Sequence, residues 1–133
     1  MPAKYPHMMP FEVPVWERFL ADPPFAPVAI SYDVHLGQGI PARAEWPPWL
    51  VKVVRATSRK RADAVVETAD ALWILEIKVR ASFSALGQLI GYGVLLLEEW
   101  KPRKPVHLGV VCERVAADMG PVLNEFGISV FVV

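Results

Sequence analysis

Three ionisable residues are spaced in a way that suits phosphodiester hydrolysis. Asp63 is followed by Glu76 and Lys78, which lie two residues apart in the apolar run ILEIKV. Two carboxylates can hold a hard divalent cation such as Mg²⁺, which binds a few oxygen ligands and keeps several waters. Such a cation lowers the pKa of water and neutralises charge that develops on the phosphate, and Lys78 adds to the same field. These residue types are therefore suited to metal-assisted hydrolysis of an anionic ester.

The segment that carries these residues has the pattern of a β-hairpin. RADAVVET (61–68) and ALWILEIKV (71–79) are rich in β-forming residues and are separated by two turn-compatible residues. With a two-residue loop, position 67 pairs with 72, 65 with 74 and 63 with 76. Asp63 then lies opposite Glu76, and because opposed carboxylates repel each other, this register predicts a bound cation. A slip of one residue would move Asp63 to the other face, and a solvated strand edge is the alternative interpretation.

A helix is predicted directly after the charged strand. SFSALGQLIGYGVLLLEEW (82–100) has a helical pattern from a Ser82 cap to an end marked by Pro102. Gln88 and Tyr92 are four residues apart, so they share one helical face. This helix contains three glycines, each of which weakens it. We expect close packing on the sheet to explain at least one of them.

The other predicted elements surround this hairpin and helix. A short helix with an apolar face begins at Pro14, a strand covers 27–37, and a helix is favoured within 47–57. VHLGVVC (106–112) and ISVFVV (128–133) are predicted as parallel strands joined by a helix. The order helix, strand, strand, strand, helix, strand, helix, strand predicts an α/β fold with a mixed sheet.

The chain is long enough for a single domain, 1–133. Ten of the thirteen prolines fall within residues 1–48, so this part is predicted to wrap around a core formed by residues 61–133. No stretch approaches the roughly 18 to 20 apolar residues of a membrane span. The start lacks a secretory signal, and Cys112, the single cysteine, cannot form an internal disulfide, so we expect a cytoplasmic protein.

The combined spacing resembles that of the PD-(D/E)XK nuclease superfamily. Asp63, twelve residues, Glu76-Ile77-Lys78, nine residues, and then Gln88 and Tyr92 follow in that order. The Gln-x-x-x-Tyr pattern is similar to that of its RecB-like branch. The resemblance covers residues 61 to 92, and the element order extends it over most of the chain. It implies a restriction-endonuclease-like core, αβββαβ with an added αβ unit.

The resemblance implies a role for each matching residue. Asp63 and Glu76 would bind one or two Mg²⁺ or Mn²⁺ ions, with the backbone carbonyl of Ile77 as a further ligand. Lys78 would orient or activate the attacking water. The pair on the following helix, Gln88 and Tyr92, would position the scissile phosphate or neighbouring DNA.

Some family members take a further carboxylate from the first helix. Glu17 is the candidate here, well ahead of Glu12, although a solvated helix face explains Glu17 equally well. Ala62 stands where the family name has proline, at a position that varies within the family.

The charged and aromatic residues give weaker indications of DNA binding. Fourteen basic residues balance fourteen acidic ones, so DNA contact would need a local patch, and Arg59, Lys60 and Arg61 precede Asp63. A second basic group, Lys101, Arg103 and Lys104, follows the helix ending near residue 100 and suits a solvated face. Trp46 and Trp49 fit a hydrophobic plug better than a base-stacking platform.

Three histidines are present, and they lack metal-ligand spacing. His35 is the one near a glycine-rich bend, and at the end of a strand we expect it to be structural.

Two functions are therefore expected from different classes. The first is a small metal-dependent DNA nuclease, acting in phage or mobile-element DNA processing or in repair, as a homo-oligomer or beside a partner protein. The second is a non-catalytic module that keeps the fold within a larger, for example viral, assembly. The intact acids and lysine favour the first, whereas the apolar content of 53% leaves room for the second.

Overall fold

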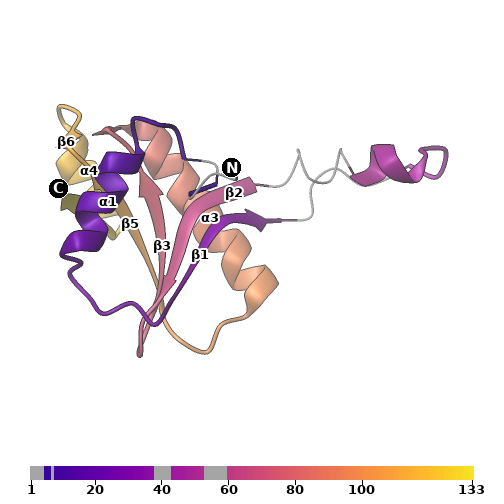
Figure 1. The fold of residues 1–133 in the computed structure, drawn as a ribbon, viewed down its shortest axis with the longest axis horizontal. Coiled ribbons are helices and arrows are strands. Elements are labelled where there is room, and N and C mark those ends of the chain that lie inside the picture. Colours follow the sequence, from indigo (N-terminus) through magenta and orange to yellow (C-terminus); the bar gives the residue numbers. More distant parts are fainter. Residues whose placement is uncertain (1–4, 7, 38–42, 53–59) are drawn as a thin grey trace.

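The computed structural model describes residues 5–6, 8–37, 43–52 and 60–133, with the side chain of Lys60 outside this description. Figure 1 shows a sheet with helices on its two faces. The elements, in chain order, are α1 (Val13–Ala21), β1 (Ala29–Leu36), β2 (Lys60–Glu67), β3 (Leu72–Ile77), β4 (Arg80–Ala81), α3 (Phe83–Trp100), β5 (Val106–Cys112), β6 (Arg114–Val115), α4 (Met119–Glu125) and β7 (Ile128–Val132).

The main sheet has five strands in the order β1-β2-β3-β5-β7. The strands β1, β2 and β3 form an antiparallel meander, whereas β3, β5 and β7 are parallel to one another. The predicted α/β fold with a mixed sheet is therefore confirmed, as is the parallel arrangement of the last two long strands. A separate pair of two-residue strands, β4 and β6, was not predicted.

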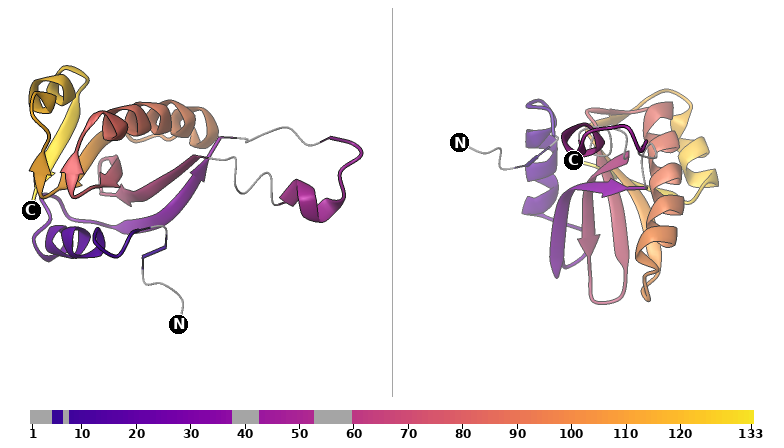
Figure 2. Two further views of the ribbon diagram at one scale, coloured as in Figure 1. Left: turned by 90° about the horizontal axis from the view of Figure 1, so that it is seen from above. Right: turned by 90° about the vertical axis from the view of Figure 1, so that its right-hand side faces the viewer.

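Two apolar clusters cover the two faces of this sheet. Val15, Trp16 and Phe19 of α1 are buried in one cluster together with Leu75 and Ile77 of β3. The other cluster joins the opposite face to α3 and α4. Figure 2 shows α1 on one side of the strands and α3 on the other. The apolar face predicted for the first helix is thus the face that packs on the sheet.

The β2–β3 hairpin has the register predicted from a two-residue loop. Glu67 pairs with Leu72, and the Thr68 N–H donates to the Ala71 carbonyl at 2.9 Å. Lys104 closes this end of the sheet, because its Nζ lies 2.6 Å from Glu67 Oε2 and 2.8 Å from the Thr68 carbonyl. Lys104, one lysine of the second basic group, is therefore partly exposed and also has a structural role.

Helix α3 packs closely on β5 at one of its glycines. A Cβ added to Gly93 would lie 3.3 Å from Leu108 Cδ2, whereas one added to Gly87 or Gly91 would meet nothing within 4 Å. Ser82 is the N-cap as predicted, but its side chain makes no capping hydrogen bond. Close packing thus explains one glycine of the three.

The proline-rich part of the chain contributes a helix and an edge strand. Strand β1 pairs with β2 at every residue except Asp33, so this part does more than wrap around the core. Residues 48–52 are helical, which agrees with the helix favoured within 47–57, and residues 53–57 lie outside the described chain. None of the described helices combines the length and the apolar character needed to cross a membrane.

Candidate active site

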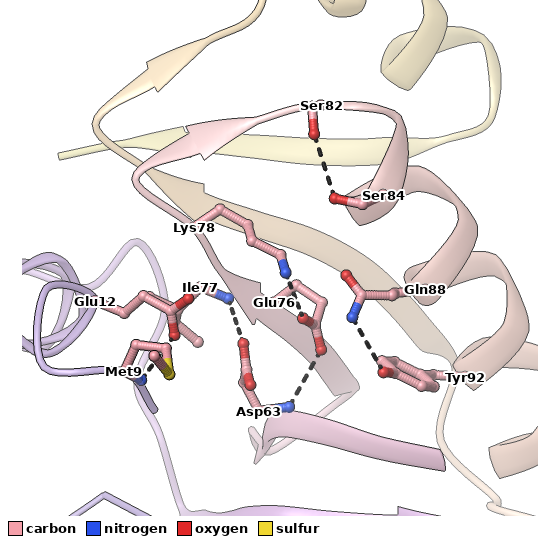
Figure 3. Close-up of polar contacts among 10 residues, drawn as sticks. All are labelled: Met9, Glu12, Asp63, Glu76, Ile77, Lys78, Ser82, Ser84, Gln88 and Tyr92. Atoms are coloured by element: carbon pink, nitrogen blue, oxygen red, sulfur yellow. Dashed lines mark hydrogen bonds and ion pairs between the residues drawn. The ribbon is translucent and has the colours of Figure 1, made fainter. Parts of the chain in front are cut away.

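The two predicted carboxylates meet where β2 and β3 separate. The paired register ends at Ala64 and Leu75. One residue further on, the Asp63 N–H donates to Glu76 Oε1 at 3.2 Å, and the Ile77 N–H donates to Asp63 Oδ2 at 2.9 Å. Figure 3 shows these reciprocal bonds between the two strands. The carboxylate of each acid thus takes the place of a backbone carbonyl as the hydrogen-bond acceptor. These bonds fix both carboxylates where β2 and β3 separate.

Burial makes this pair electrostatically unfavourable when both acids are ionised. Glu76 is 1% exposed and Asp63 is 5% exposed. Burial, and then the nearby charge of Asp63, raise the pKa of Glu76 to about 9. Lys78 opposes this shift, since its Nζ lies 3.9 Å from Glu76 Oε2. A further cation between the acids would favour the ionised form of Glu76.

The helix pair also belongs to this group of side chains. Gln88 Nε2 donates to the Tyr92 hydroxyl oxygen at 3.5 Å, and Figure 3 shows both residues extending from α3 toward Glu76. Burial, and then the charge of Glu76, raise the pKa of Tyr92 to about 12, so Tyr92 remains a neutral hydrogen-bond donor. Gln88 Oε1 is buried and accepts no hydrogen bond from any residue that the structure describes. The pair therefore offers the Tyr92 proton as a hydrogen-bond donor to a bound group.

The first helix places Glu12 nearer to these acids than sequence reasoning suggested. Glu12 is the N-cap of α1, is 9% exposed, and accepts a hydrogen bond from the Met9 N–H at 3.2 Å. Figure 3 shows its side chain reaching toward Ile77 and Asp63. Glu17 instead lies on the exposed face of α1. Of the two glutamates, Glu12 rather than the preferred Glu17 is the one directed toward the site.

The predicted DNA-binding run is described only in part. Arg59 and the side chain of Lys60 lie outside the described residues. Arg61 is 35% exposed, and its Nε lies 3.7 Å from Asp33 Oδ1. Sequence reasoning missed this contact, because the two residues are far apart in the chain and meet only through the β1–β2 pairing.

The donor set fits a cation that keeps much of its water. In the described parts of the chain, no group of three or more His, Cys, Asp or Glu side chains is arranged to hold a metal ion. Asp63 and Glu76 supply two carboxylates, and Mg²⁺ typically binds through one or two carboxylates together with waters and substrate phosphates. The residues present are therefore compatible with Mg²⁺ or Mn²⁺ and leave coordination positions for substrate.

Comparison with known proteins assigns no family. No family model matches the chain, and neither a curated protein nor a solved structure is significantly similar to it. The function must therefore be argued from the residues themselves.

Proposed function

We propose that this protein is a metal-dependent DNA nuclease with a restriction-endonuclease-like core of the PD-(D/E)XK type. The observation that carries this proposal is the exchange of hydrogen bonds by which Asp63 and Glu76 are held together, buried, beside Lys78. Burying two neighbouring acids is unfavourable when both are ionised, and a bound cation offsets this cost. The order of the strands and helices is compatible with such a core.

In this proposal Asp63 and Glu76 hold the cation, and the Ile77 carbonyl adds a ligand. When bound, Mg²⁺ or Mn²⁺ supplies Lewis acidity, which lowers the pKa of water and offsets the negative charge that develops on the phosphate. Two carboxylates alone would repel an anionic substrate, so the ion is needed for binding as well as for hydrolysis.

The other site residues orient the water and the substrate. Lys78 is partly exposed, so its ammonium can reach both the attacking water and a phosphate oxygen while remaining near Glu76. Tyr92 keeps its proton and can donate to a phosphate oxygen. Gln88 donates to the Tyr92 hydroxyl oxygen and so orients Tyr92 for this contact.

A non-catalytic assembly module is the second candidate, and one surface favours it. Helix α3 exposes four large apolar side chains, of which Trp100 is the last. The other three share one helix face: Phe83 is 69% exposed, Val94 54% and Leu97 53%. Exposed apolar side chains that line up on one helix face are typical of a protein interface. This surface is compatible with a homo-oligomer or with a separate partner protein.

Cleavage assays distinguish the two candidates. Plasmid and linear DNA are incubated with the purified protein in Mg²⁺, Mn²⁺ or EDTA, next to Lys78→Ala and the control Arg103→Ala. Arg103 is exposed and adjoins Leu72, at the end of β3 remote from the acids. We expect cleavage that requires the metal and Lys78 but not Arg103. Cleavage that persists in EDTA contradicts the proposed mechanism, and inactivity of folded protein together with stable oligomers favours the assembly module.

A further inference from the structure

The pairing of β1 with β2 is interrupted next to the carboxylate site. Tyr32 pairs with Ala64 and Val34 pairs with Ala62, but Asp33 between them has a φ of 49°. Tyr32 and Ala64 pack in the cluster beneath α1, whereas Val34 and Ala62 pack in the cluster beneath α3. Residues two apart on a strand normally point to the same face of the sheet. In both strands the side chains therefore change from one face to the other between these two pairs, at Asp33 and the opposite Asp63.

Asp33 lies between two nitrogen-bearing side chains beyond this break. Its Oδ1 is 3.7 Å from Arg61 Nε, and its Oδ2 is 3.8 Å from His35 Nε2. Both distances lie within ion-pair range and exceed hydrogen-bonding range. Within the described chain the terminal nitrogens of Arg61 have no partner. These are the two atoms with which arginine forks around a phosphate.

The strand registers bring these side chains next to the proposed metal ligands. Asp33 lies opposite Asp63, between the pairs Tyr32–Ala64 and Val34–Ala62, and the Asp63 N–H donates to Glu76. Two residues beyond Asp63 on β2, about 6–7 Å of strand, Arg61 pairs with His35 of β1. The two acids are thus followed along β2 by a pair of nitrogen-bearing side chains. The acids themselves lie toward the carboxyl end of β3, the kind of sheet edge where α/β proteins bind ligands.

An ordinary surface ion cluster does not explain the backbone at Asp33. A left-handed conformation is unfavourable for a residue other than glycine, and an ion pair between neighbouring strands forms without it. Such a conformation is typical of residues whose position serves a site. At Asp33 the left-handed conformation changes the direction of β1 and keeps the carboxylate within 4 Å of nitrogen atoms of His35 and Arg61.

We propose that Arg61 and His35 bind a backbone phosphate of duplex DNA next to the phosphate that is cleaved. Arg61 would make the main contact through its terminal nitrogens, and His35 would add an N–H donor, which it has in either protonation state. Asp33 is a positioning residue that holds both. The location of this subsite rests on the proposed nuclease function, but its binding of DNA can be measured without cleavage.

The test measures DNA binding at several salt concentrations. Binding of a labelled 20-base-pair duplex (about two helical turns) is followed by fluorescence anisotropy, with Ca²⁺ in place of Mg²⁺. Arg61→Ala should weaken binding roughly tenfold, because a charged hydrogen bond is lost, and should reduce the slope of log K against log[salt] by about one. His35→Ala should weaken binding less. Arg103→Ala removes an equal charge at the other end of the sheet and should leave the slope unchanged.

The outcomes test the phosphate subsite separately from the proposed nuclease activity. Arg61→Gln keeps much of the side chain, so a loss of binding shared by Arg61→Gln and Arg61→Ala, with unchanged melting temperatures, supports the subsite. Equal slopes for Arg61→Ala and Arg103→Ala overturn it, even if the wild-type protein cleaves DNA in Mg²⁺. Failure of the wild-type protein to bind the duplex at low salt also overturns it. If the slope falls as expected but no cleavage occurs, the subsite stands and the nuclease proposal fails.

Discussion

At the scale of single residues, the raised pKa of Glu76 links stability to pH. The free carboxyl has a pKa near 4.5, whereas burial and Asp63 raise that of Glu76 to about 9 in the folded protein. The folded state therefore binds more protons than the unfolded state between these values, so this group's contribution to stability falls as pH rises from about 4.5 to about 9.

Glu76→Gln should remove much of this dependence in metal-free protein. The amide is neutral at every pH and can still accept from the Asp63 N–H. We expect the variant to be more stable than the wild type at pH 8 in EDTA by on the order of 1–3 kcal/mol, and the difference to shrink toward pH 5. Thermal melts across this range provide the measurement. If the melting temperatures of the two proteins depend on pH in the same way, ionisation of Glu76 does not destabilise the folded state.

The backbone of Asp33 gives a second prediction at this scale. Asparagine adopts the left-handed region more readily than alanine, and both substitutions remove the same carboxylate. Asp33→Ala should therefore be less stable than Asp33→Asn by about 1–2 kcal/mol. Urea unfolding measures the difference, and equal stabilities would mean that the strand relaxes at this position.

The residues of the site differ in how far the sequence could predict them. Asp63 and Glu76 could be placed together, because a two-residue loop fixes their relation within one hairpin. Glu12 could not, since its burial depends on where α1 begins and on how that helix packs against β3. Asp33 was missed for a related reason: its contact with Arg61 depends on pairing between strands separated by a long segment.

At the scale of elements, α3 offers a matched test of helix packing. Gly87 has open space around its added Cβ, so Gly87→Ala should stabilise the protein by roughly 0.5–1 kcal/mol through helix propensity. Gly93→Ala should gain less or lose stability, because its Cβ would lie 3.3 Å from Leu108. Chemical denaturation of both variants measures these changes in the free energy of unfolding. An equal gain at both positions would mean that Leu108 moves aside without cost.

Most elements of this fold have a local sequence signal, and the exceptions have physical reasons. The long strands and α3 were predictable from β-rich runs and helical periodicity. The strands β4 and β6 were not, because two residues carry no periodicity and their pairing depends on the path of the chain after β3 and β5. The role of Lys104 was also hidden, since only the folded hairpin brings Glu67 beside it.

At the scale of the whole molecule, the candidate site lies where the two packed layers meet. Ile77 belongs to the cluster beneath α1, whereas Tyr92 belongs to the cluster beneath α3. Asp63 and Glu76 hold β2 and β3 together between these layers. The repulsion within the acid pair therefore acts on contacts that join both halves of the fold, and a bound cation should stabilise the protein as a unit.

Binding of Mg²⁺ should therefore raise the melting temperature of the whole chain. At a concentration ten times the dissociation constant the gain is about 1.4 kcal/mol, or roughly 4–8 °C for a domain of this size. The cation competes with the proton on Glu76, so the rise should be larger at pH 8 than at pH 6. Scanning calorimetry with and without EDTA measures it, and Glu76→Gln should show little change. A similar rise in that variant would place the binding of Mg²⁺ elsewhere and remove the basis for a metal site at these acids.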